Sequence, residues 1–142
     1  MGCVTTTPPS PTATRLRRGI FAVSGAVLST TLIWTAAHAL GVEFRVDPHN
    51  GQPPGTIGLP FAVAVTLAAA LIGWGVRALL QRITRRASTA WTVLAFIALT
   101  ASFLPLLAVG ASGTTKAALA SMHLAVAAVL IPVFGRGRFY GK

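Results

Sequence analysis

Few residues in this sequence could do chemistry inside an apolar environment, and the clearest are two histidines. His38 and His123 each fall within a long apolar segment. Ionisable side chains are rare in membrane segments, and where they occur they often bind ligands or transfer protons. We expect both rings in the outer halves of their segments, at similar depth, where they could meet across a helix interface. Two histidines without a nearby carboxylate or thiol make a poor metal site, so a hydrogen-bonding role between helices is the favoured interpretation.

The rest of the sequence shows no pattern for catalysis or cofactor binding. The only two acids, Glu43 and Asp47, stand together in one hydrophilic stretch, so no Ser-His-Asp set and no pair of catalytic carboxylates is recognisable. There is no glycine-rich phosphate loop. The single cysteine, Cys3, cannot form a disulfide within the chain. We therefore expect no enzymatic activity, no metal and no cofactor.

Composition indicates that the solvent of this chain is a bilayer. Of the 142 residues, 54% are hydrophobic and only 10% are charged, whereas soluble domains carry about 25% charged residues. The mean hydropathy is +0.71. A soluble domain of this size keeps much of its surface in water, so it could not hide this much apolar surface.

Four apolar stretches are each long enough to cross a hydrocarbon core about 30 Å thick at about 1.5 Å per helical residue. They cover residues 19–42, 57–80, 91–109 and 117–134. Backbone groups in lipid must pair within a helix or a closed barrel, and these stretches lack the alternating polarity of barrel strands. The predicted fold is therefore all-α, an integral membrane bundle of four transmembrane helices over residues 19–134. Residues 1–18 are expected to form a disordered tail, because Pro8, Pro9 and Pro11 fall within four positions and should not continue a helix. Residues 135–142 are expected to form a basic tail.

The basic residues predict the orientation of this bundle. With an inner N-terminus, ten of the twelve Lys and Arg residues lie on the inner side and two on the outer side, as the positive-inside rule requires. The inner ten are Arg15, Arg17, Arg18, Arg77, Arg82, Arg85, Arg86, Arg136, Arg138 and Lys142, and the outer two are Arg45 and Lys116. Arg77, within the second stretch, is expected to snorkel to the interface. We expect a plasma-membrane protein with both termini in the cytoplasm and with anionic lipid at its inner face. Nucleic acid is not an expected partner, because the basic residues do not share one polar surface.

The first apolar stretch has a competing interpretation. Arg15, Arg17 and Arg18, the stretch that follows them and Ala37-His38-Ala39 resemble a secretory signal with its cleavage site. Cleavage would leave three spans and an outer N-terminus. The stretch is longer than the roughly 7–15 apolar residues of a signal core, so four spans are preferred while cleavage stays open.

Small residues recur every four positions in several stretches, where they would let helices approach closely. They are Ala22, Ala26 and Thr30, then Ala69 and Gly73, then Ala117, Ser121 and Ala125. Packing within the bundle is the favoured interpretation, and a homo-oligomer interface is the alternative. Pro105, inside the third stretch, removes one helix hydrogen bond and crowds the carbonyl of Ala101, so we expect a kink there.

The last third of the chain carries a family resemblance. The residues concerned are Trp91-Thr92-Val93, Pro105, and the run from Thr114 through His123 to Pro132. With these the chain resembles a family of uncharacterised four-span membrane proteins of actinobacteria, known only as a domain of unknown function. The resemblance implies the same layout and brings no activity, ligand or catalytic residue. The leading hypothesis is a small non-enzymatic membrane protein with a structural or partner-binding role. The alternative is a small oligomeric transporter or channel with a polar seam near His38 and His123.

Overall fold

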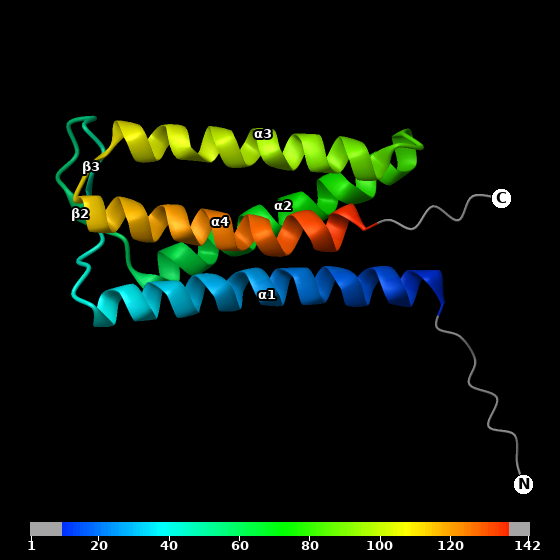
Figure 1. Ribbon diagram of the computed structural model, residues 1–142, viewed down its shortest axis with the longest axis horizontal. Helices are drawn as coiled ribbons and strands as arrows, with labels where there is room; N and C mark the ends of the chain where they lie inside the picture. Colours follow the sequence, from blue (N-terminus) through cyan, green and yellow to red (C-terminus); the bar gives the residue numbers. More distant parts are fainter. Residues whose placement is uncertain (1–9, 137–142) are drawn as a thin grey trace, which may run out of the picture.

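Four long helices, closed at one end by a small sheet, make up the computed structural model, which describes residues 10–136 (Figure 1). The helices are α1 (Pro11–Ala39), α2 (Leu59–Ile83), α3 (Ala87–Ala108) and α4 (Gly113–Gly135). Each is long and apolar enough to cross a membrane. The predicted all-α bundle of four transmembrane helices is therefore confirmed.

Helix α1 begins well before the predicted boundary. The expected tail over residues 1–18 is wrong from Pro11 onward, and residues 1–9 lie outside the described part of the chain. The hydroxyl of Ser10 accepts a hydrogen bond from the backbone N–H of Ala13 at 3.3 Å and caps the helix. Pro11 occupies the first turn, where a missing N–H leaves no bond unmade. The proline that suggested a break is thus part of a helix start.

Other helix ends also differ from the predicted boundaries. Ser112 caps α4 by accepting from the N–H of Thr115 at 3.2 Å, so the helix starts four residues before the predicted span. Helix α4 ends at Gly135. The basic tail was predicted over residues 135–142, and residues 137–142 lie outside the described part of the chain. A short connection over residues 84–86 joins α2 to α3. Helix α3 continues through Pro105.

Helix α1 packs against α2 and α4, and α3 packs chiefly against α4, while α2 and α3 touch only sparsely. The buried face of α1 is made of Gly19, Ala22, Ala26 and Thr30, as the small-residue spacing predicts. Ala22 and Ala26 share a core cluster with residues of all three other helices. Removal of α1 by cleavage after Ala39 would therefore strip one wall from the core.

The small residues of α4 do not face the core. Ala117 and Ser121 are exposed and Ala125 is half-buried, whereas the buried residues in this region are Ala118, Leu119 and Met122. The favoured interpretation, packing within the bundle, is thus wrong for Ala117 and Ser121. The physical reason is that α4 is apolar on every side, so its sequence does not mark which face turns inward.

A three-stranded antiparallel sheet covers one end of the bundle, where the sequence predicts only loops. Its strands are β1 (Arg45–Asp47), β2 (Gly55–Thr56) and β3 (Gly110–Ala111), in the order β2-β1-β3. Strands this short show no periodicity that a sequence pattern could reveal. We call this the sheet end, and the opposite end, with the start of α1, the connection 84–86 and the end of α4, the arginine end (Figure 1).

Candidate functional site

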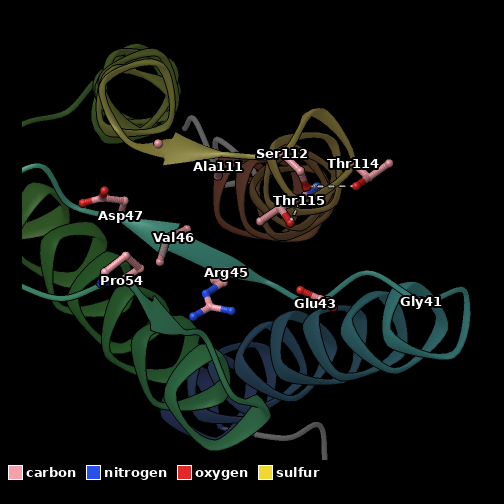
Figure 2. A pocket seen from close by; sticks show the side chains of 11 residues that line it. Gly41, Glu43, Arg45, Val46, Asp47, Pro54, Ala111, Ser112, Thr114 and Thr115 are labelled. Carbon is pink, nitrogen blue, oxygen red and sulfur yellow. Dashed lines mark hydrogen bonds between the residues drawn. The ribbon is translucent and has the colours of Figure 1, made fainter.

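A polar pocket of about 510 Å³ lies at the sheet end (Figure 2). Figure 2 shows Glu43 and Asp47, the only acids in the sequence, at opposite ends of β1. The carboxylate of Asp47 accepts the backbone N–H of His49 at 2.9 Å and lies 3.6 Å from its Nδ1. Hydroxyls at the start of α4 line the opposite wall.

Several polar groups of this pocket form hydrogen bonds with one another. Ser112 Oγ lies 3.0 Å from the hydroxyl of Thr114 and 2.9 Å from that of Thr115, while it also caps α4. Among residues 10–136 no group of three or more His, Cys, Asp or Glu side chains could hold a metal ion. These hydroxyls therefore have a structural role, as the cap of α4.

The two histidines lie apart. His38, one residue before the end of α1, is exposed and stacks on Trp34 with the ring centroids 4.7 Å apart. His123 lies ten residues into α4, about 15 Å deeper, where its Nδ1 donates to the carbonyl of Leu119 at 2.7 Å. Its ring neighbour is Phe103, with the centroids 6.1 Å apart. The expected similar depth is wrong, and the structure gives the two rings separate partners.

An apolar groove of about 740 Å³ separates α2 from α3. Helix α4 forms its floor, and it extends from Phe61 and Leu106 near the sheet end to Val76 and Trp91 toward the arginine end. Five of the residues that line it carry polar side-chain atoms, namely Thr30, Thr66, Trp91, Ser102 and His123. Ala69 and Gly73 also line it, so these two small residues of α2 leave space in the groove.

The groove extends along much of the bundle. Fifteen residues of α2 separate Phe61 from Val76, which corresponds to roughly 22 Å along the helix axis. A hydrocarbon chain could lie along this length, because the lining is almost wholly apolar.

Two buried polar atoms without a hydrogen-bond partner in the described residues lie toward the arginine end. Arg77 is only 6% exposed, so the expectation that it snorkels to the interface is wrong. Within residues 10–136 its Nη1 and the Nε1 of Trp91 have no hydrogen-bond partner. Arg77 is buried because it continues the inward face of α2, seven residues after Ala70 and four after Gly73, whose backbone lies close to the ring of Trp91.

Side chains from other helices hold the end of α4 at the same place. Arg18 Nη1 donates to the carbonyl of Arg136 at 2.8 Å. The hydroxyl of Ser88, at the start of α3, donates to the carbonyl of Gly135. The last carbonyls of α4 are therefore bound by α1 and α3.

Four apolar helices packed around a shared core define a multi-pass membrane protein. Its sequence matches a family of unknown function, DUF6069, over residues 10–138, and the chain belongs to this family. No curated protein and no solved structure matches it. The predicted membership of a domain of unknown function is confirmed, while an actinobacterial origin stays a prediction.

Sequence reasoning missed the burial of Arg77 and the groove. A signal for Arg77 was present, because it is a charged residue in an apolar span of a chain whose two acids both lie in one distant loop. The groove had no such signal, since it depends on how far α2 and α3 diverge.

Proposed function

We propose that this chain is a small non-enzymatic protein of a bacterial plasma membrane that binds one hydrocarbon chain of a membrane lipid between α2 and α3. The groove is the observation that carries the proposal. Its volume of about 740 Å³ lies within the roughly 300–1,000 Å³ of small-molecule sites, and its lining is almost wholly apolar. An unfilled groove would forfeit dispersion contacts along both walls, so a chain that fits stabilises the bundle.

The length and the lining of the groove support a lipid chain as its occupant. A hydrocarbon chain is slim and flexible enough to follow an apolar groove roughly 22 Å long. Small residues such as Ala69, Gly73 and Ala98 line the walls and leave space for such a chain. A second copy of the chain is an outcome that the experiment below can reveal.

The distribution of charge supports an orientation with the arginine end in the cytoplasm. Of the ten basic residues within residues 10–136, eight belong to the segments at the arginine end or just inside it, and Arg45 and Lys116 belong to the sheet end. Short segments of this kind follow the positive-inside rule. Both termini then belong to the cytoplasmic side.

A transporter or channel lacks a supporting observation in the described residues. Such a function needs a polar path, and His38 and His123 lie at different depths with separate ring partners. The groove that spans much of the bundle is apolar instead.

Photolabelling with a phospholipid that carries a diazirine in its acyl chain tests the proposal. We expect crosslinks, mapped by mass spectrometry, on residues of the groove. Ala69→Leu and Ala98→Leu narrow the groove from its two walls and should lower this labelling several-fold. The matched controls are Ala68→Leu and Ala101→Leu, exposed residues of the same helices that do not line the groove. Equal labelling of all four variants, or crosslinks to a second copy in place of lipid, would overturn the proposal.

A further inference from the structure

The arginine end contains a buried positive charge that no carboxylate of the described chain can neutralise. Arg77 is 6% exposed and its Nη1 has no hydrogen-bond partner within residues 10–136. The sequence has two acids, Glu43 and Asp47, and both lie at the sheet end. Helix α2 begins at Leu59, eighteen residues before Arg77, so the sheet end is roughly 27 Å away along the helix.

A second guanidinium group lies near the first. Arg18 of α1 lies at nearly the same level as Arg77 of α2. The residue after it, Gly19, packs so closely on the ring of Trp74, three residues before Arg77, that a Cβ atom on Gly19 would overlap this ring. The structure therefore places an exposed arginine, Arg18, beside the arginine end of α2, in which Arg77 is buried.

The end of α4 offsets only part of this charge. A helix C-terminus carries a partial charge of about −0.5, and cations near it are stabilised. The carbonyls of Gly135 and Arg136, however, already accept hydrogen bonds from Ser88 and Arg18. Neither bond involves Arg77, whose burial without a partner is costly.

A phosphate group is an anion that suits this arrangement. A guanidinium group presents paired N–H donors that match two oxygens of a phosphate. Arg77 stands six residues before the end of α2, about 9 Å from it, so a phosphate group would have to enter the end of the bundle to reach this guanidinium group.

We propose that Arg77 and Arg18 form a binding site for a phosphate group at the arginine end of the bundle. The group is either the phosphodiester of a lipid headgroup or a free phosphate, since both offer the same oxygens. The site goes beyond the proposed function, because it lies at the end of the bundle and requires no chain in the groove.

Thermal unfolding of the full chain in a phosphate-free maltoside detergent tests the site. The additives are inorganic phosphate at constant ionic strength, phosphatidylglycerol, and diacylglycerol, which shares the acyl chains of phosphatidylglycerol but has no phosphate. For the wild-type protein we expect a rise in Tm with a phosphate-bearing additive beyond any rise with diacylglycerol. An effect of diacylglycerol alone would report on the groove, so the two proposals can fail separately.

The variants are Arg77→Gln and Arg85→Gln, and the second removes an equal charge at an exposed position of the same end. Loss of a charged hydrogen-bonding pair should weaken the phosphate-dependent affinity about ten-fold or more in Arg77→Gln. Arg85→Gln should respond like the wild-type protein, and Arg18→Gln should change in the same direction as Arg77→Gln. If Arg77→Gln does not fold, Arg77→Lys replaces it and should bind several-fold more weakly, since it lacks the two-point fork.

A response to inorganic phosphate supports a site for a soluble anion, and a response to phosphatidylglycerol alone supports a headgroup site. The proposal is overturned if no phosphate-dependent shift occurs in the wild-type protein. It is equally overturned if the Arg77 variant responds as strongly as Arg85→Gln.

Discussion

The hydroxyl groups of Thr30 and Thr66 lie 2.9 Å apart and form a buried hydrogen bond between α1 and α2. Both residues belong to the inward faces on which the two helices pack, and both border the groove. Most of the other buried residues of these two faces are alanine or glycine, which cannot form a side-chain hydrogen bond, whereas this bond is directional. It fixes the axial position of α1 against α2.

The bond predicts an energetic coupling between the two threonines. A double-mutant cycle with Thr30→Val and Thr66→Val should give a coupling of about 0.5–1.5 kcal/mol, in the range of hydrogen bonds between membrane helices. Reversible unfolding in detergent measures it. Thr100→Val is the control, because the Thr100 hydroxyl bonds to Phe96 of its own helix. A coupling near zero would show that the two hydroxyls do not support each other.

Substitution by alanine should change the stability of the bundle in opposite directions at two glycines. A methyl group on Gly19 would overlap the ring of Trp74, whereas one on Gly75 meets no atom within 4 Å. Gly19→Ala should therefore destabilise the bundle by about 1–3 kcal/mol through overpacking. Gly75→Ala should stabilise it by up to about 1 kcal/mol through helix propensity. Tm values in one detergent compare them, and a lower Tm for Gly75→Ala would contradict the geometry.

The sheet end predicts a large effect at Phe44. This side chain is 0% exposed and stacks on Trp34 with the centroids 5.5 Å apart, while Trp34 Nε1 donates to the carbonyl of Ile57 at 3.1 Å. Phe44→Ala should lower the free energy of unfolding by about 3–5 kcal/mol, as for other buried aromatic residues. The control, Phe96→Ala, removes an exposed ring of α3 and should change it much less. Similar losses for both variants would mean that the ring of Phe44 is not a core residue.

The orientation predicts which engineered cysteines a membrane-impermeant maleimide can reach. Cys3 is the only cysteine, so Cys3→Ser provides a silent background. In intact cells we expect Gln52→Cys, in the exposed loop between β1 and β2, to be labelled. Arg85→Cys, in the connection at the arginine end, should be labelled only after the membrane is opened. The reverse pattern would invert the proposed topology.

The existence of the helices was predictable, but their ends were not. Four long apolar stretches require helices in lipid whatever their packing, which is why the fold class follows from composition. Helix ends depend on single capping groups such as the hydroxyls of Ser10 and Ser112. A run of prolines and hydroxyl residues reads equally as a tail or as a helix start, so Pro11 misled the interpretation.

The candidate sites were less predictable, because they depend on which face of each helix turns inward. In a membrane bundle the lipid-facing and core-facing residues are both apolar, so α4 shows no stripe that separates Ser121, which is exposed, from Met122, which is buried. The depth of His123 in the bundle depends on where α4 begins. Because the predicted start of this helix was four residues too late, the predicted depth of His123 was wrong as well. Arg77 stood out by its charge, yet only the packing of α1 against α2 shows that it is covered.

The two walls of the groove are tied together at both ends of the bundle. At the arginine end α2 runs into α3 through residues 84–86, and at the sheet end β1 pairs with β2, just before α2, and with β3, just after α3. The groove is therefore closed at both of its ends, and α2 and α3 can move apart only along the middle of the bundle. A lipid chain bound there as proposed would enter sideways from the surrounding bilayer, and its occupancy would then depend on the composition of the membrane and not on solutes in the water on either side.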